Sequence, residues 1–132
     1  MKKLFNKVAV VTGAGSGIGR AIAQAFAAEG CKVMVSDINP ERVQETVDAI
    51  RSSGNEATGL IANMAEQKDA EALIDAAVNT YGSLDILVNN AGVMDNFEPV
   101  GSVEDNTWER VMKVNVDGPF FAMRKAVQYF AT

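Results

Sequence analysis

The stretch VVTGAGSGIGRAIAQAFAAEG, residues Val10–Gly30, carries four glycines within seven positions, directly after a valine-rich apolar run. That run, Lys7–Thr12, is short and continuous, as is typical of a strand buried on both faces. After the glycines, apolar residues recur at helical spacing up to Gly30, which stands where a glycine commonly follows a helix end. The stretch therefore predicts a strand, a tight glycine-rich turn and a helix.

The rest of the chain alternates between strand and helix patterns in the same way. Further strands are expected over residues 32–37, 56–62 and 84–90, with helices over residues 40–54 and 66–81 and a last one to the C-terminus. Such alternation predicts parallel strands joined by right-handed crossovers. The expected fold class is α/β, with a doubly wound, Rossmann-like sheet that is incomplete and has the strand order 3-2-1-4.

Two helix starts have their own signals. Asn39 followed by Pro40 is typical of an N-cap and a first helical position. Ser102, with Asp105 three residues further on, predicts the start of the last helix.

Length and composition limit the possible classes of protein. A chain of 132 residues that is 48% hydrophobic predicts one domain, residues 1–132, with enough apolar material for a core. The formal net charge is −5 without a sustained basic run, which argues against a nucleic-acid partner, because phosphate binding needs clustered Lys and Arg. No stretch approaches the length of a membrane span, so no membrane partner is expected either.

The counts of two residue types narrow the chemistry. The chain contains no histidine, which excludes Ser-His-Asp and Cys-His catalysis and any histidine-based metal site within it, and no metal site is expected. The single cysteine, Cys31, cannot form an intrachain disulfide. A reducing compartment fits this count, and a cytoplasmic location is expected.

The glycines Gly13, Gly15, Gly17 and Gly19 stand at the carboxyl end of the first expected strand and open the next helix. A nucleotide binds at this place in a doubly wound sheet, because glycine lets the backbone approach a pyrophosphate and a helix N-terminus offers N–H groups. No lysine follows the last glycine, so the loop is not of the GxxxxGK[ST] type. The alternative is a tight turn without a ligand.

An acidic residue points to the kind of nucleotide. Asp37 ends the second expected strand, 18 residues after Gly19, where a carboxylate can accept hydrogen bonds from an adenosine ribose. A 2′-phosphate would meet its negative charge, and neither Ser16 nor Ile38 offers a positive charge beside it. NAD is therefore preferred over NADP. The alternative is a solvated carboxylate that caps the turn at Asn39.

With these residues in hand, the sequence resembles the short-chain dehydrogenase/reductase family. TGAGSGIG (Thr12–Gly19) matches the family's cofactor motif TGxxxGxG, and NNAG (Asn89–Gly92) matches its motif after the fourth strand. Asn115, in KVNVDGPF, matches the asparagine of the family's long central helix. The motifs occur in the family's order, and the resemblance extends from Lys7 to the end of the chain.

The resemblance implies an NAD-dependent oxidoreductase that transfers a hydride between NAD(H) and an alcohol or carbonyl substrate. The positions that it assigns to the cofactor are Gly13, Gly15, Ser16, Gly17, Ile18, Gly19, Asp37, Ile38, Asn63, Met64, Asn89, Asn90, Ala91 and Gly92. One position departs from the pattern, because the family usually carries an aspartate where this chain has Asn63. The amide oxygen of Asn63 is expected to accept from the adenine amino group instead.

Asn115 is the one catalytic candidate. Pro119, four residues later, has no N–H to donate to the Asn115 carbonyl, and Gly118 weakens the helix further. The carbonyl is therefore expected to be free, and the family resemblance implies that it holds a water of a proton relay. The alternative is a kink required only by packing.

The rest of the family's machinery does not match this chain. The resemblance implies a catalytic serine and a Tyr-x-x-x-Lys pair, but Tyr81 is followed four positions later by Asp85, and only three residues follow Tyr129. The chain is therefore expected to be the cofactor-binding half, truncated before that segment, inactive alone, and paired in a homo-oligomer or with a complementary fragment. Asp95, Asn96 and Phe97 border a substrate pocket or lie in an ordinary surface loop.

Two other functions compete with this interpretation. One is a non-catalytic dinucleotide-binding module or pseudoenzyme subunit. The other is a methyltransferase, whose sheet also uses glycines and an acidic residue, but the motifs TGAGSGIG and NNAG argue against it.

Overall fold

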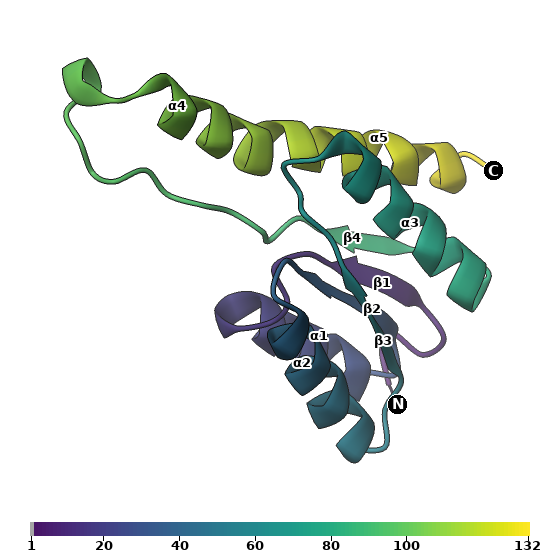
Figure 1. Ribbon diagram of the computed structural model, residues 1–132. Helices are drawn as coiled ribbons and strands as arrows, with labels where there is room; N and C mark the ends of the chain where they lie inside the picture. The colour runs from purple at the N-terminus through teal and green to yellow at the C-terminus, as the bar shows by residue number, and fades with distance from the viewer. Residues whose placement is uncertain (1) are drawn as a thin grey trace.

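The computed structural model describes residues 2–132 and contains one parallel sheet of four strands in the order β3-β2-β1-β4. Its strands are β1 (Val8–Val11), β2 (Lys32–Asp37), β3 (Ala57–Ile61) and β4 (Ile86–Val88). Every pairing is parallel, with Val10 opposite both Met34 on β2 and Leu87 on β4. The predicted doubly wound, Rossmann-like sheet with the order 3-2-1-4 is confirmed (Figure 1).

Helices cover both faces of the sheet (Figure 1). On one face lie α1 (Gly17–Ala28) and α2 (Pro40–Ser52), and on the other lie α3 (Gln67–Tyr81) and α5 (Gly118–Phe130). A short 3-10 turn η1 (Val100–Ser102), helix α4 (Asp105–Met112) and a π-helical segment η2 (Lys113–Asp117) lead into α5. The chain between β4 and α4 extends away from the sheet and then turns back (Figure 1).

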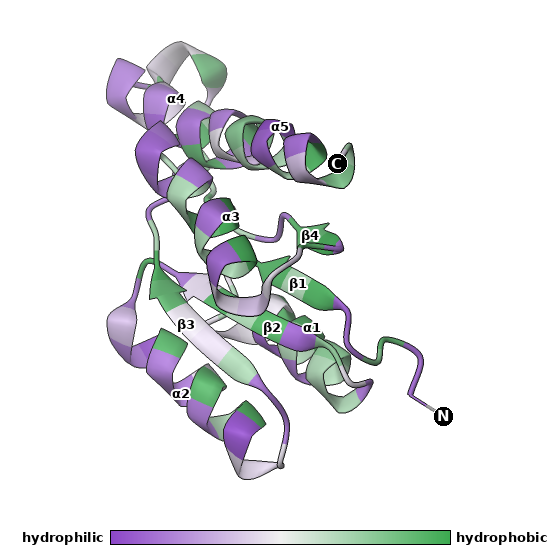
Figure 2. Ribbon diagram, turned by 90° about the vertical axis from the view of Figure 1, so that its right-hand side faces the viewer, coloured by the Kyte–Doolittle hydropathy of each residue, from purple (hydrophilic) through white to green (hydrophobic). Residues whose placement is uncertain are grey.

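The core is divided by the sheet into two layers because successive strand residues point to opposite faces. Val33 and Val35 of β2 pack with α1 and α2, while Met34 between them packs with α3 and α5. All four residues of β1 are buried, so both faces of the central strand are apolar. Figure 2 shows these hydrophobic strands between helices that carry hydrophilic residues on their outer sides.

Local signals at the helix ends agree with the structure. The Asn39 side chain accepts from the N–H of Arg42 at 3.1 Å, and Pro40 is the first residue of α2. Gly30 and Gly82 follow helices in the left-handed region, with φ of 89° and 83°. A side chain with a Cβ rarely adopts this conformation, which is why glycine ends these helices.

Two expectations were wrong in detail. Ser102 does not cap the last helix: it lies in η1, Val103 is extended, and α4 begins at Asp105 after Glu104. The reason is local, because the N–H of Ser102 already donates to the Pro99 carbonyl at 2.8 Å and closes a separate turn. β4 is shorter than the predicted strand over 84–90 and only half-buried, because it pairs with β1 on one side alone.

Candidate functional site

The predicted site residues meet at the carboxyl ends of the four strands, because parallel strands all end at the same edge of the sheet. A cavity of about 150 Å³ opens there, between the glycine loop after β1 and the segments that follow β2, β3 and β4. Its lining residues are Gly13, Ser36, Asp37, Ile38, Ala62, Asn63, Met64, Ala91, Gly92, Val93 and Val114.

Seven of the fourteen predicted cofactor residues line this cavity, and the others surround it or lie apart. Gly15, Gly17 and Gly19 belong to the adjoining loop and the start of α1, where Ser16 and Ile18 are exposed. Asn90 bonds the glycine loop through its side chain, whereas Asn89 is exposed and does not line the cavity. The structure therefore gathers the loop, Asp37 and the segments after β3 and β4 around one space.

The glycine loop is held by a threonine that the sequence analysis did not single out. The Thr12 hydroxyl accepts from the N–H groups of Asn90 and Ala91, both at 3.0 Å, and so ties the end of β1 to the segment after β4. The Asn90 side chain donates to the Gly13 carbonyl at 3.1 Å. The signal was present, since Thr12 is the first letter of the TGxxxGxG match, but its role depends on the neighbouring strand.

A second missed residue holds the loop from the other side. Thr46, in the middle of α2, is fully buried and donates its hydroxyl to the Ala14 carbonyl at 3.0 Å. The sequence does contain a signal for Thr46, because it lies on the same side of the expected helix as the apolar residues. The loop is therefore fastened to both β4 and α2, so that its backbone N–H groups keep fixed directions.

Two of the glycines are required by close packing rather than by backbone freedom alone. A Cβ at Gly19 would overlap the Gly13 carbonyl oxygen. A Cβ at Gly13, which also has a φ of +61°, would lie 2.9 Å from the Ala91 Cα. Gly17 differs, because its φ is +57° and open space surrounds it. The loop is therefore packed tightly toward the protein and left open at the start of α1.

Asp37 fastens the glycine loop to the end of β2. Its carboxylate accepts from the Gly15 N–H at 2.9 Å through Oδ2 and from the Asn39 N–H at 3.2 Å through Oδ1. The second bond is the capping role that was the alternative interpretation. A carboxylate has about four acceptor positions, so both bonds leave room for a ligand hydroxyl in the cavity that Asp37 lines.

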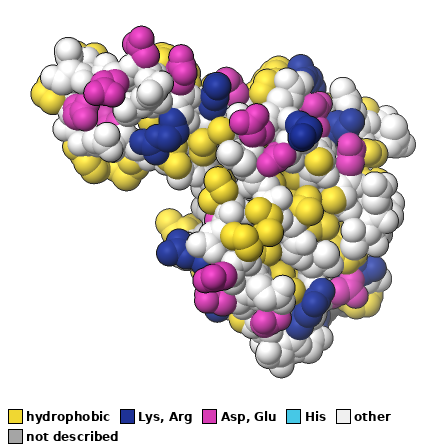
Figure 3. Space-filling model, viewed as in Figure 1, with side chains coloured by type: hydrophobic (Ala, Val, Ile, Leu, Met, Phe, Trp, Pro, Cys, Tyr) yellow, Lys and Arg dark blue, Asp and Glu magenta, His cyan; other side chains and the backbone are white. Residues whose placement is uncertain are grey.

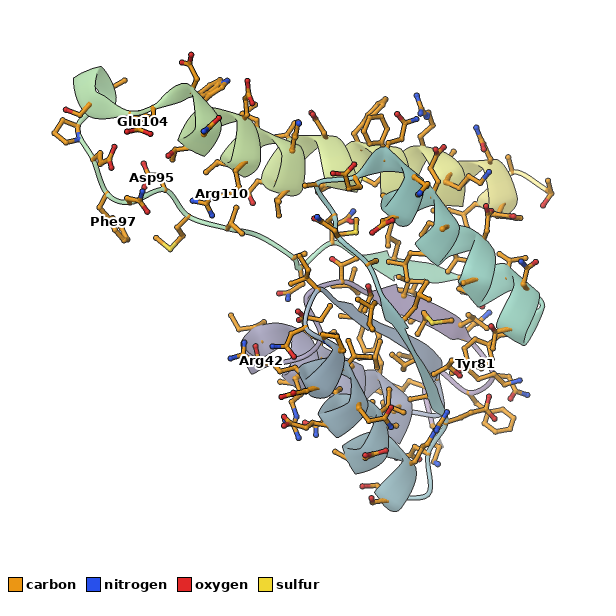
Figure 4. The ribbon with its side chains drawn as sticks, in the orientation of Figure 1. Arg42, Tyr81, Asp95, Phe97, Glu104 and Arg110 are labelled. Carbon is orange, nitrogen blue, oxygen red and sulfur yellow. The ribbon has the colours of Figure 1, made fainter. Side chains whose placement is uncertain are left out.

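An arginine lies beside the loop that Asp37 holds, although it is not next to Asp37 in the sequence. Arg42 is exposed in the first turn of α2, and a Cβ added at Gly15 would lie 2.8 Å from both the Arg42 Cβ and the Asp37 Oδ2 (Figure 4). From the sequence, only Ser16 and Ile38 were expected beside Asp37. Arg42 was missed because the turn of chain into α2, and not sequence adjacency, brings it to the loop.

The segment after β3 contributes the side-chain amide of Asn63 and the main chain of Met64 to the cavity wall. Asn63 accepts from the Ala65 N–H at 3.0 Å through Oδ1, and its own N–H donates to Asp69 Oδ2 at 2.9 Å. The Met64 side chain is buried with the residues of α3 and α5, so this residue can meet a ligand only through its main chain. Ser36, also on the cavity wall, is 1% exposed and its hydroxyl has no hydrogen-bond partner.

Asn115 lies in the π-helical segment and bonds the loop after β4. Its Nδ2 donates to the Val93 carbonyl at 2.7 Å, and its Oδ1 accepts from the Val93 N–H at 2.8 Å. The helix is irregular where Gly118 and Pro119 predicted it, but the irregularity is a π turn, in which the Gly118 N–H bonds to the Lys113 carbonyl. The free Asn115 carbonyl stays a prediction.

The structure gives a second reason for glycine at position 118, which the sequence did not reveal. A Cβ there would overlap the Met64 carbonyl oxygen. Glycine at this position therefore lets α5 approach the segment after β3, which brings Asn115 and the cavity wall together.

A second, larger cavity of about 480 Å³ shares the lining residue Val93 with the first. It is lined by Val93, Met94, Asp95, Glu98, Val100, Val103, Thr107, Trp108, Val111 and Asn115. Of the three loop residues considered for a substrate pocket, Asp95 is on this wall, whereas Asn96 and Phe97 are not (Figure 4). Figure 3 shows hydrophobic side chains along the lower side of the projecting arm that carries this cavity.

Neither tyrosine reaches the cavities. The Tyr81 hydroxyl donates to Thr58 Oγ1 at 2.8 Å, and burial raises its pKa. The Tyr129 hydroxyl donates to Asp75 Oδ1 at 2.8 Å, and this hydrogen bond raises its pKa. A tyrosine that acts as a base needs a lowered pKa, so both groups are structural.

No helix among residues 2–132 is long and apolar enough to cross a membrane. No group of three or more Cys, Asp and Glu side chains in the same range could hold a metal ion.

Comparison with known proteins places the chain in a family. The family model for short chain dehydrogenases matches residues 7–132. The 3beta-hydroxysteroid dehydrogenase 2 of Eggerthella lenta is 39% identical over 127 residues, which cover 96% of this chain and 49% of that protein. The cyclohexanol dehydrogenase of Acinetobacter sp. strain SE19 is 42% identical over 125 residues, which cover 95% of this chain and 50% of that protein.

A solved structure of the same kind superimposes closely. A metagenomic short-chain oxidoreductase in complex with NADP gives a TM-score of 0.92 at 29% identity, over 96% of this chain and 57% of that one. The chain belongs to the short-chain dehydrogenase/reductase family, whose members bind a nicotinamide dinucleotide. It spans about half the length of the curated relatives it matches.

Proposed function

We propose that this chain forms the cofactor-binding half of an NAD(H)-dependent oxidoreductase that acts on an alcohol or carbonyl substrate. The observation that carries the proposal is the convergence of the glycine loop, Asp37, Asn63 and the segment after β4 on one cavity at the carboxyl ends of the strands. Ligands of doubly wound sheets bind in this place. Family membership adds that the ligand is a nicotinamide dinucleotide.

The residues present fit such a group. Helix α1 has 12 residues, and Ser16 makes no side-chain cap, so the first N–H groups of the helix are available to a pyrophosphate beside Gly17. The unpartnered Ser36 hydroxyl in the cavity wall gives a buried polar atom for a ligand or its water to satisfy. When bound, a nicotinamide dinucleotide supplies the hydride acceptor or donor of an oxidoreductase.

Asp37 supports NAD over NADP in this proposal. Its carboxylate would accept from the ribose hydroxyls and repel a 2′-phosphate. Two observations favour the opposite choice: Arg42 beside Gly15, and a similar structure in complex with NADP. We give Asp37 the greater weight because its oxygens are oriented into the loop by two backbone N–H groups, whereas the Arg42 side chain is exposed.

Asn115 has two roles in the proposal. Its side chain positions Val93, between the two cavities, through the paired hydrogen bonds. Its carbonyl, next to Pro119, would order the water of a proton relay, as the family resemblance implies. The larger cavity, which Asn115 lines, would take the substrate, and the names of the two curated relatives support an alcohol.

The proposal also covers the state of the protein. No Tyr-x-x-x-Lys pair occurs in this sequence, so the 132 residues alone would bind a dinucleotide without turning over a substrate. A homo-oligomer or a complementary fragment would cover the apolar side of α5, where Phe120, Val127 and Phe130 are about half exposed. A cytoplasmic location is part of the same proposal.

Isothermal titration calorimetry with NAD and NADP tests the cofactor choice. We expect tighter binding of NAD, and Asp37→Ser should weaken it about 10- to 150-fold, since a hydrogen bond to a charged group contributes roughly 1.5–3 kcal/mol. Arg42→Met, which keeps the apolar stem, should leave the ratio of the two affinities unchanged. Equal or tighter binding of NADP by the unmodified protein would contradict the proposal.

The competing function is a non-catalytic dinucleotide-binding module, and the remote positions of both tyrosines favour it. The intact mass of the protein isolated from its source separates the two. A mass about twice the 14.1 kDa of this chain, with a Tyr-x-x-x-Lys pair downstream, supports the enzyme. A mass of 14.1 kDa together with dinucleotide binding supports the module.

A further inference from the structure

The orientation of the Asn63 side chain determines what the cavity offers a ligand. Its terminal amide can be turned in two ways, and only a neighbour of known polarity decides between them. That neighbour is the Ala65 N–H, which can only donate and lies 3.0 Å from the amide. The oxygen of Asn63 must therefore face Ala65, and Nδ2 takes the other position.

This orientation leaves a donor without an acceptor at the cavity wall. Nδ2 carries two N–H groups, and no acceptor among residues 2–132 bonds to them. Ser36, which also lines the cavity, has a buried hydroxyl without a partner. A ligand group with a carbonyl oxygen or a ring nitrogen would satisfy Nδ2, whereas an amino group would oppose it donor to donor.

We propose that this cavity does not select a 6-amino purine and binds a 6-oxo purine dinucleotide at least as well as an adenine dinucleotide. Nδ2 of Asn63 would donate to the 6-oxo oxygen of hypoxanthine. The inference rests on the proposed function, because it concerns the base of the dinucleotide in the same cavity. It differs from the expectation that the Asn63 oxygen accepts from an adenine amino group, because that oxygen faces Ala65 and Nδ2 is the amide atom without a protein partner.

A single isosteric exchange should reverse the preference. Asn63→Asp keeps an oxygen toward the Ala65 N–H and places a second oxygen where Nδ2 stands. That oxygen accepts from a 6-amino group and repels a 6-oxo group. We expect the affinity for NAD, relative to its hypoxanthine analogue, to rise about tenfold, in keeping with one hydrogen bond to a charged group.

The experiment titrates the 132-residue protein with NAD and with nicotinamide hypoxanthine dinucleotide by calorimetry. The unmodified protein should bind the hypoxanthine dinucleotide as tightly as NAD or more tightly. Asn79→Asp, which adds the same charge at an exposed position on α3, is the matched control and should leave the ratio unchanged. The measurement on the unmodified protein stands even if Asn63→Asp fails to fold.

Three outcomes separate this inference from the proposed function. Binding of neither dinucleotide overturns both. Tighter binding of NAD than of the hypoxanthine dinucleotide by the unmodified protein overturns the inference alone, because it means that the second lone pair of Asn63 Oδ1 accepts from the amino group. A ratio that Asn63→Asp and Asn79→Asp change equally also overturns the inference alone.

Discussion

The two cavities, which share the lining residue Val93, are built in different ways. The smaller one lies at the ends of the strands, where Thr12, Thr46 and Asp37 bond the glycine loop to β4, α2 and β2. The larger one lies under the arm between β4 and α5, where Trp108 is 62% and Val100 94% exposed. In the described residues, side chains hold the start of this arm at two points, through Asn115 to Val93 and Arg110 to Met94.

The two regions differ in how far the described residues pack around them. At the strand ends, other segments of the chain surround the glycine loop. Polar groups of these segments hold the loop, which would meet a cofactor, in place. The arm presents apolar side chains to solvent, and such exposed surface is typical of a face that other protein segments cover. Substitutions should therefore have large effects at the strand ends and small ones in the arm.

The largest effect is expected from Gly19→Ala. The added Cβ overlaps the Gly13 carbonyl oxygen, so the loop must move. We expect a loss of about 1–3 kcal/mol in the free energy of unfolding, as for other overpacked sites. Dinucleotide affinity should fall by about 100-fold or more because the phosphate-facing backbone shifts. Urea unfolding and calorimetry measure the two quantities.

The matched control for this exchange is Gly101→Ala in the arm. Nothing lies within 4 Å of a Cβ at Gly101, so neither quantity should change. Unimpaired binding by the Gly19→Ala protein would mean that the loop does not meet the phosphates.

The next effect in size is expected from Thr12→Val, which keeps the shape and removes the hydroxyl. The Ala91 N–H loses its acceptor, and the Asn90 N–H keeps only the Val88 carbonyl at 3.2 Å. A buried donor left without a partner costs about 1–3 kcal/mol, so urea unfolding should show a destabilisation of that size. Thr80→Val, at an exposed position on α3, is the control. Equal stability of the two variants would refute the role of Thr12 as the link between β1 and β4.

Ser36→Ala should separate stability from binding. The Ser36 hydroxyl is buried without a partner, so its removal should raise the free energy of unfolding by about 1 kcal/mol. If the dinucleotide satisfies this hydroxyl, the same exchange should lower its affinity about 2- to 10-fold. Thermal unfolding without ligand measures the change in stability, and calorimetry with NAD measures the change in affinity. A loss of stability in the ligand-free protein would show that the hydroxyl has a partner.

The smallest effect is expected in the arm. Asn115→Leu removes both hydrogen bonds to Val93, but these bonds are exposed, so the free energy of unfolding should fall by no more than about 1 kcal/mol. Amide hydrogen exchange at Val93 should become faster, whereas exchange at Asn90 and Ala91 should not change. A large destabilisation would mean that Asn115 stabilises the strand ends. The two regions would then not differ in the way described above.

Local patterns in the sequence were sufficient for the fold class. The apolar runs, the helical spacing and the turn residues Asn39, Pro40, Gly30 and Gly82 depend on neighbours within a few residues. The first three strands and the first three helices lie where these patterns placed them, whereas β4 is shorter and the last helix begins later. The strand order 3-2-1-4 was expected because it is the usual order of the doubly wound fold that the alternating elements indicated. The prediction that Ser102 starts the last helix also failed for a local reason. The Ser102 N–H donates to the Pro99 carbonyl and closes a separate turn.

The sequence by itself therefore determined the elements, the order of the strands, the family and the edge of the sheet where the site residues meet. Only the tertiary structure decided that Thr12 and Thr46 hold the loop, that Arg42 lies beside Gly15, and that the Asn63 oxygen is already bonded. The physical reason is distance along the chain. Periodicity and capping act over a few residues, whereas a hydrogen bond from Asn90 to Thr12, or a helix packed against Gly15, depends on segments that only folding brings together.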